Sequence, residues 1–327
     1  MIRRASIVFA AVALLACDNA GADRVTGITA AGVVRGAVFF DANGSRSRDA
    51  ADAPFAGARV RLLAPISRDT VLRVTTDASG GFRLASVPVG TYEVVIDPAT
   101  GGDTAIVVGN TATVTVTPGD SVSWEGSLSF PIRTVAEARA LGPSSARFFV
   151  AGVALNARAT FSDTTLHLAA ATGTIRATRV RPSTTPFAAG DSVRVRARIA
   201  TRLGQVVLDD VDVFVIGPTF APTAVALTTL QASTADAATR DAQVVHLSDA
   251  QITDTATVGG SLTLTMSDGS GPVTVVLDRS ADVGFRAPFP VGEYQAPNRF
   301  DVTGVLVPTG LGSWVVKPRS PLDLLRR

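Results

Sequence analysis

The sequence of 327 residues is 46% hydrophobic and 18% charged, a composition that supplies buried cores and excludes a chain disordered throughout. Arg3 and Arg4 lie in an N-terminal segment typical of a cleaved signal, and without them 28 basic side chains balance 28 acidic ones. This balance excludes a general electrostatic attraction to nucleic acid or other polyanions.

Residues 1–16 predict a secretory signal peptide, because the two arginines precede a short apolar run at 7–15. That run is too short to span a bilayer as a mature helix. The closing residues Leu14-Leu15-Ala16-Cys17 resemble a bacterial lipobox, in which the cysteine is lipidated and becomes the new N-terminus. The resemblance implies a lipid anchor at Cys17 and a place in the bacterial cell envelope, either periplasmic or surface-exposed. The alternative is an ordinary signal peptide cleaved nearby.

Residues 17–31 predict a lipidated tether, because they are rich in Ala, Gly, Thr and Asp. From residue 32 onward, apolar and polar residues alternate with a period of two between turns of Gly, Pro, Asp and Asn. This alternation predicts antiparallel strands with one dry face, and therefore an all-β protein. Since Cys17 is the only cysteine, the folded domains must hold by core burial without disulfides.

The first folded block, residues 32–130, carries turn and core residues in a fixed order. Asp77 and Gly80 predict a hairpin turn, and Pro88 and Gly90 predict a second tight turn. Further landmarks of the block are Gly36, Phe39, Asn43, Gly44, Pro54, Gly57, Val60, Leu62, Phe82 and Tyr92. The pattern resembles the B-type repeat domain of bacterial surface adhesins and its carboxypeptidase-regulatory-like relatives. The resemblance implies a seven-stranded β-sandwich that acts as a stalk or spacer.

The resemblance also implies a calcium loop, since the first loop of these relatives often follows a dockerin-like or EF-like pattern. Loop positions 1, 3, 5, 9 and 12 are Asp41, Asn43, Ser45, Asp49 and Asp52. Arg46 stands where the sharp turn prefers glycine, and Asp52 is shorter than the usual bidentate glutamate. These departures favour the alternative, a solvated loop of Asx turns.

The second block, residues 131–217, predicts a short helix and five strands. Thr134 is the expected N-cap of the helix at 134–141, and Glu137 completes a capping box. The strands are expected at 148–156, 166–170, 174–180, 192–201 and 205–215. Gly190-Asp191-Ser192-Val193 with Gly204-Gln205 downstream resembles an OB-fold barrel of the type attached to bacterial extracellular nucleases and surface proteins.

The third block, residues 218–327, repeats this plan after a weaker helix near 227–238. Val302 and Gly312 correspond to Val195 and Gly204 of the second block. A repeat of this length is a whole domain. We therefore expect two five-stranded OB-like barrels, each preceded by a short helix.

An arginine face is predicted outside the first barrel, because arginines alternate with the inward-facing Val193, Val195 and Ala197. The candidate face consists of Arg176, Arg179, Arg181, Arg194, Arg196, Arg198 and Arg202. OB-folds bind oligonucleotides or oligosaccharides on such faces. The alternative is cross-strand pairing with the aspartates at 209, 210 and 212. Aromatic residues are only 6% of the chain, which disfavours a platform for base stacking.

No residue set typical of catalysis stands out. His167 and His246 each lie between apolar residues, and no serine elbow, zinc-binding pair or phosphate loop occurs. We expect a non-enzymatic lipoprotein, anchored to the membrane, whose sandwich is a spacer and whose tandem OB-like modules bind an envelope protein or glycan. The alternatives are recognition of extracellular nucleic acid or glycan by the first barrel and, third, an accessory part in an exported hydrolase system. Apart from calcium, no cofactor is expected.

Overall fold

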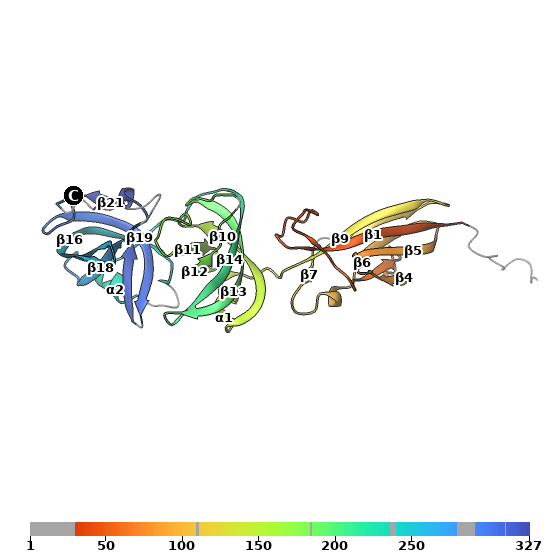
Figure 1. Cartoon of the computed structure of the whole chain (residues 1–327), viewed down its shortest axis with the longest axis horizontal. Helices are drawn as coiled ribbons and strands as arrows, with labels where there is room; N and C mark the ends of the chain where they lie inside the picture. Colours follow the sequence, from red (N-terminus) through yellow and green to blue (C-terminus); the bar gives the residue numbers. More distant parts are fainter. Residues whose placement is uncertain (1–29, 109–110, 184, 236–239, 280–291, 311) are drawn as a thin grey trace, which may run out of the picture. The chain divides into compact units, whose positions relative to one another are not determined.

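The computed structural model describes residues 30–108, 111–183, 185–235, 240–279, 292–310 and 312–327 (Figure 1). The predicted signal peptide, Cys17 and nearly all of the tether lie outside these residues. Strands make up most of the described chain, which confirms the all-β prediction. The chain divides into two compact units, the first with residues up to 38, 56–97 and 110–126, the second with 39–55, 98–109 and 127–327.

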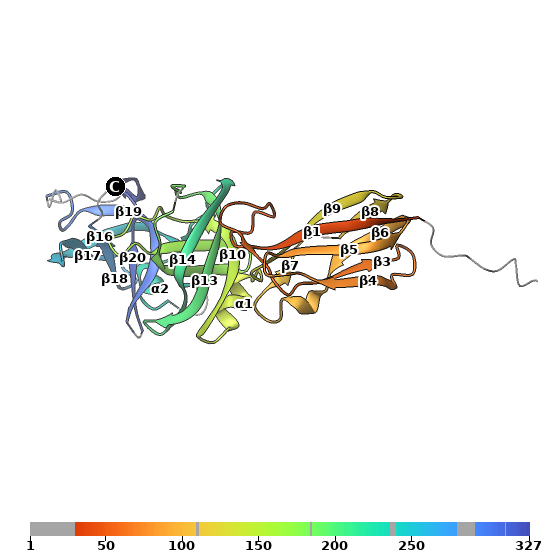
Figure 2. The ribbon, with the colours of Figure 1, turned by 45° about the vertical axis from the view of Figure 1, so that its right-hand side comes forward.

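Two sheets supply the strands of the first unit (Figure 2). The strands are β1 (Ala31–Asp41), β3 (Arg59–Leu63), β4 (Thr70–Thr75), β5 (Gly81–Pro88), β6 (Gly90–Ile96), β8 (Ala112–Val116) and β9 (Ser121–Ser129), of which β1 and β9 continue into the second unit. One sheet has the order β4-β3-β6-β8, and in the other β5 pairs with β1. Alternation over the first four residues of β3 buries Val60 and Leu62 and turns Arg59 and Arg61 to the outer face. These seven strands agree with the predicted sandwich.

The second unit begins with short elements from the same block. They are β2 (Ala53–Pro54), the 3₁₀ helix η1 (Pro98–Thr100) and β7 (Ile106–Val107). β2 pairs with β1, and β7 pairs with β9. Ser129 Oγ donates a buried hydrogen bond of 2.8 Å to the backbone oxygen of Asp41. This bond fixes the start of the loop that carries the predicted calcium ligands.

A helix and a closed barrel follow. The helix α1 (Val135–Ala140) has Thr134 as N-cap, and the reciprocal bonds with Glu137 confirm the capping box. The barrel strands are β10 (Ser144–Ala154), β11 (Leu166–Ala170), β12 (Gly173–Val180), β13 (Asp191–Arg202) and β14 (Gln205–Pro218), closed in the order β10-β11-β12-β14-β13. Val193, Val195 and Ala197 are fully buried in the core, as their alternation predicts.

The last part of the chain repeats this arrangement. The elements are β15 (Val225–Ala226), α2 (Thr229–Ser233), β16 (Val244–Val258), β17 (Ser261–Ser267), β18 (Pro272–Leu277), β19 (Arg299–Gly310), β20 (Ser313–Lys317), the 3₁₀ helix η2 (Pro321–Asp323) and β21 (Leu324–Arg326). The order β16-β17-β18-β20-β19 closes through the β16–β19 pairing. In both rings only the third and fifth strands pair in parallel. Gly204 and Gly312 take the same left-handed conformation in the last hairpin, with φ of 73° and 80°.

Val302 lies fully buried in the second barrel and pairs with Leu247, while Val195 pairs with Val150 in the first. The predicted repeat of helix and barrel is therefore confirmed in its strand order, its hairpins and its inward-facing residues.

The two barrels share an apolar cluster. The residues of this cluster are Leu155, Phe161 and Ala169 from the first barrel and Val244 and Val305 from the second. At its margin, Arg176 Nε donates to Asp241 Oδ1 at 2.8 Å, and the two side chains are 5% and 0% exposed. A second ion pair joins Lys317 Nζ to Asp278 Oδ2 at 2.6 Å, with the ammonium 5.1 Å from the centroid of the Phe161 ring.

Candidate functional site

The loop with the predicted calcium ligands is held by hydrogen bonds between its own residues. The buried Asp41 carboxylate accepts through Oδ1 from Gly44 N–H at 2.7 Å and Ser45 N–H at 3.0 Å, and through Oδ2 from Arg46 N–H at 2.8 Å. Asp52 accepts from the backbone N–H groups of residues 42 and 49 at 3.0 and 2.9 Å. These are the bonds of an Asx-turn network.

The remaining predicted ligands also belong to this network. Asn43 Nδ2 donates to Asp49 Oδ2 at 2.7 Å, and Asn43 Oδ1 accepts from Ser45 N–H at 2.8 Å. Arg46 makes the sharp turn in the left-handed region, with φ of 65°, although it lacks the freedom of glycine. Within the described ranges, no group of three or more His, Cys, Asp or Glu side chains is arranged to hold a metal ion. The donor set fits the Asx-turn alternative, and calcium binding stays a prediction.

A thermal titration tests calcium at this loop. Because the carboxylate oxygens already accept N–H bonds, we expect millimolar Ca²⁺ to leave the melting temperature of the mature chain unchanged relative to Mg²⁺. Asp41→Ala should lower the free energy of unfolding by roughly 1–2 kcal/mol, since it leaves three part-buried N–H groups without their acceptor. Asp103→Asn, at an exposed position outside the loop, serves as the control. A Ca²⁺-specific rise in melting temperature that Asp41→Ala removes would establish the calcium site instead.

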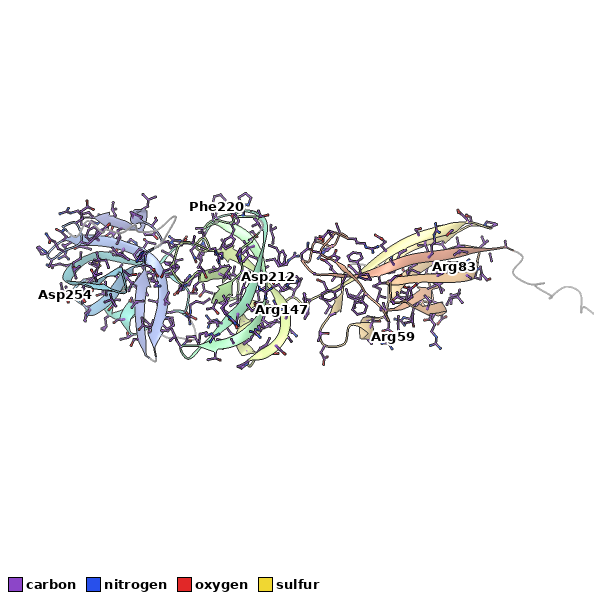
Figure 3. All side chains as sticks on the ribbon, viewed as in Figure 1. Arg59, Arg83, Arg147, Asp212, Phe220 and Asp254 are labelled. Carbon is purple, nitrogen blue, oxygen red and sulfur yellow. The ribbon has the colours of Figure 1, made fainter. Side chains whose placement is uncertain are left out.

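The arginines of the predicted face lie on β12 and β13, with Arg181 directly after β12, and most of them pair with the aspartates of β14 (Figure 3 labels Arg147 and Asp212 on this barrel). The ion pairs of this face join Arg179, Arg198 and Arg202 to Asp209, Arg181 to Asp210 and Asp212, Arg196 to Asp212, and Arg147 to Asp210 and Asp212. The hydrogen bond from Arg179 holds the pKa of Asp209 below its ordinary value. This arrangement agrees with the alternative stated for the sequence, in which the arginines pair across strands with the aspartates at 209, 210 and 212.

Arg194 and Arg196 have a further role within the second unit. Arg196 Nη1 donates to the backbone oxygen of Ala42 at 2.7 Å, and Arg194 donates to that of Gly44. The guanidinium group of Arg194 lies 5.6 Å from the centroid of the Phe149 ring. That of Arg196 lies 5.5 Å from the centroid of the Phe130 ring. Two sequence predictions, the arginine face and the Asp41–Asp52 loop, are thus brought together through backbone oxygens of the loop.

Arg176 is a correction to the predicted face. Its side chain points out of the first barrel, as the alternation requires, but it is 5% exposed because Asp241 covers it. Thr174 Oγ1 also donates to the backbone oxygen of Asp241, at 2.6 Å. Arg176 is therefore part of the contact between the barrels and is not available to an external ligand.

The two histidines have structural partners. His167 is buried, and its Nδ1 lies 2.9 Å from Asn156 Oδ1. Burial, followed by the charges of Arg176, Lys317 and Arg319, holds the pKa of His167 well below its ordinary value. His246 Nδ1 lies 3.0 Å from Thr303 Oγ1. The partner of His167 is an amide, which is not a nucleophile.

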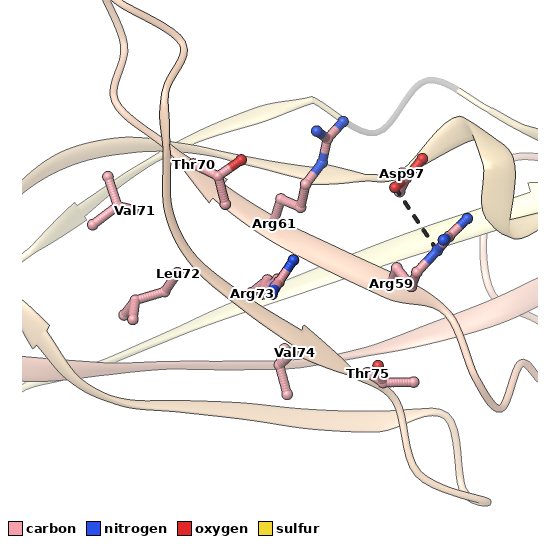
Figure 4. Close-up of a pocket in the computed structure, with 9 residues that line it drawn as sticks. All are labelled: Arg59, Arg61, Thr70, Val71, Leu72, Arg73, Val74, Thr75 and Asp97. Atoms are coloured by element: carbon pink, nitrogen blue, oxygen red, sulfur yellow. Dashed lines mark ion pairs between the residues drawn. The ribbon is translucent and has the colours of Figure 1, made fainter.

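A hollow of about 880 Å³ in the first unit was not anticipated from the sequence (Figure 4). Its lining consists of Arg59, Arg61, Thr70, Val71, Leu72, Arg73, Val74, Thr75 and Asp97. Arg59 and Arg61 are two residues apart on β3 and so share a face, which the alternation indicates. Arg73 joins them through the β3–β4 register, which the sequence does not reveal.

One family model matches part of the chain. Residues 47–124 match the carboxypeptidase regulatory-like domain, which confirms the resemblance inferred for the first block. No curated protein matches the chain. Among the described residues, no helix has the length and apolarity to cross a membrane.

Solved structures similar to this chain include two pilins. The minor pilin GBS52 of Streptococcus agalactiae is 14% identical over 31% of this chain and 45% of its own, with a TM-score of 0.24. The major pilin SpaD of Corynebacterium diphtheriae is 10% identical over 53% of this chain and 39% of its own, with a TM-score of 0.26. This chain thus spans less than half the length of either pilin.

A murine DNA-binding protein bound to double-stranded DNA is also similar, at 8% identity over 55% of this chain and 96% of its own, with a TM-score of 0.31. At these TM-scores, the similarities carry no argument about fold or function.

Proposed function

We propose that the protein is a non-enzymatic, lipid-anchored component of the bacterial cell envelope, periplasmic or surface-exposed. Cys17 supplies the anchor, the first block is a spacer, and two OB-like barrels contact an envelope protein or glycan. The match of residues 47–124 to a regulatory-like β-domain supports the spacer role. The identical strand order of the two rings, each with one parallel pair, supports two OB-like modules.

The observation that carries this proposal is the contact between the barrels. A shared apolar cluster and the buried pair Arg176–Asp241 hold one ring against the other. Separating the rings would expose the apolar side chains to water and break the ion pair, so the tandem behaves as one stiff body. A stiff body fits a protein that presents a surface at a distance from the membrane.

The charges of the first barrel weigh against its recognition of nucleic acid. The exposed arginines share three aspartates on the adjacent strand, and these carboxylates would repel a phosphate backbone. Phe149 is buried and takes part in an aromatic cluster, so it is not a free stacking surface.

Removal of the lipidated residue tests the proposal. We expect the native protein in the membrane fraction, with a diacylglycerol-modified Cys17 at its N-terminus by mass spectrometry. Cys17→Ala should move the protein to the soluble fraction, whereas Thr26→Ala in the tether should leave it with the membranes. An unmodified N-terminus at another position would contradict the lipid anchor.

A further inference from the structure

The hollow on the first unit is strongly cationic. Three arginines line it, Arg59, Arg61 and Arg73, against a single acid, Asp97, which lies 3.8 Å from Arg59 (Figure 4). Arg61 and Arg73 form no ion pair with any described residue, and Arg61 Nε is buried without a hydrogen-bond partner there. The hollow therefore keeps donor capacity that the folded chain does not use.

The register places two of these arginines directly opposite each other. Arg61 on β3 pairs with Arg73 on β4, on the same face of the sheet. Like charges in directly opposed positions destabilise a sheet. A bound anion between them would turn this repulsion into two charge-assisted contacts, because a guanidinium binds a carboxylate in a planar, bidentate manner.

The hollow also follows the edge of the sheet. β4 is the end strand of the order β4-β3-β6-β8 and pairs only with β3 among the described strands. All six of its residues, Thr70–Thr75, line the hollow. An end strand presents a row of backbone N–H and C=O groups on its open side, to which another extended chain can add.

We propose that this edge binds an extended acidic polypeptide segment, which pairs with β4 through its backbone and places carboxylates against Arg61 and Arg73. The N–H and C=O row matches a polypeptide, whereas a glycan has no such alternating ladder. Nucleic acid fits poorly, because no aromatic side chain lines the hollow to stack a base. This site is distinct from the surface assigned to the barrels.

The test is a binding titration of the mature chain, purified in detergent, with three fluorescent peptides. One peptide alternates glutamate and valine, the second has glutamine for glutamate, and the third is the acidic peptide with alternate backbone amides N-methylated. We expect saturable binding of the first peptide alone. Arg61→Gln and Arg73→Gln should each weaken that binding by about tenfold or more, the loss expected for a charge-assisted hydrogen bond.

Arg83→Gln is the matched control. Arg83 is exposed on β5 and lies opposite Arg35, so its replacement also removes one of two opposed arginines, but outside the hollow. We expect it to leave the peptide affinity unchanged. Equal binding of the N-methylated peptide, or equal losses from Arg83→Gln and Arg73→Gln, would overturn the proposal. Binding of polygalacturonate or single-stranded DNA that depends on Arg61, without binding of the acidic peptide, would also overturn it.

Discussion

Arg176→Met is expected to lower the free energy of unfolding by about 3–5 kcal/mol at neutral pH, the range for a buried ion pair that loses one partner. The variant leaves the carboxylate of Asp241 at 0% exposure without the guanidinium that lies 2.8 Å from it. Urea unfolding in a Trp124→Phe background measures the loss, so that the fluorescence of the buried Trp314 alone reports on the second barrel.

The double variant Arg176→Met/Asp241→Leu should recover most of that loss, because both charges are then replaced by apolar groups. If it is as unstable as the single variant, shape and not charge controls this contact. If Arg176→Met is as stable as the unmodified chain, the buried carboxylate of Asp241 is not stabilised by its ion pair with Arg176.

The pH dependence of the same variant gives a second measurement. Burial raises the pKa of Asp241 above its ordinary value of 3.8, and loss of the Arg176 charge should raise it further. The folded state then binds the proton more tightly than the unfolded chain does, so the contribution of Asp241 to stability is present at low pH. It is lost as the pH rises from 3.8 through the folded pKa. The deficit of Arg176→Met should therefore be smaller in acid than at pH 7.

Val195→Asp should cost roughly 4 kcal/mol or more, because it buries a carboxylate without a partner. Val195 is fully buried in the first barrel and lies opposite Val150 on β10. The measurement is again urea unfolding of the mature chain, with the near-ultraviolet circular dichroism of the barrels as the signal.

Thr201→Asp is the control for this substitution. Thr201 lies on the same strand, β13, but its side chain is exposed, so the same carboxylate should change stability by no more than about 0.5 kcal/mol. Thr201 is in phase with Val195 along the strand, so equal effects of the two substitutions would show that burial of the carboxylate does not set the cost.

The parts of the fold that depend on near neighbours in the chain were predictable. The alternation on β13 identifies its buried face because successive side chains point to opposite sides of a strand. The helix start at Thr134 follows from a residue three positions later, Glu137. The correspondence of Gly204 and Gly312 follows from a shared order of strands and turns.

The parts that depend on distant residues were not predictable from this reasoning. Alternation places Arg176 outside its barrel, but the residue that covers it, Asp241, lies 65 positions further along the chain. The Asp41–Asp52 loop shows a related limit. Its residue types suit either a cation or backbone N–H groups, and only the positions of the N–H groups distinguish the two. For the same reason, the hollow beside β4 could not be predicted. Arg73 joins Arg59 and Arg61 only through the β3–β4 register.

The burial of Lys317 determines how the protein can be labelled and modified. It is the only lysine in the sequence, and its side chain is 15% exposed where the two barrels meet. All other side-chain cations apart from the histidines are arginines, which do not react with acylating reagents as an amine does. Among the side chains, the single amine is sheltered by Asp278 and Phe161. Its acylation therefore reports the opening of the barrel contact, without the background that surface lysines give in most proteins.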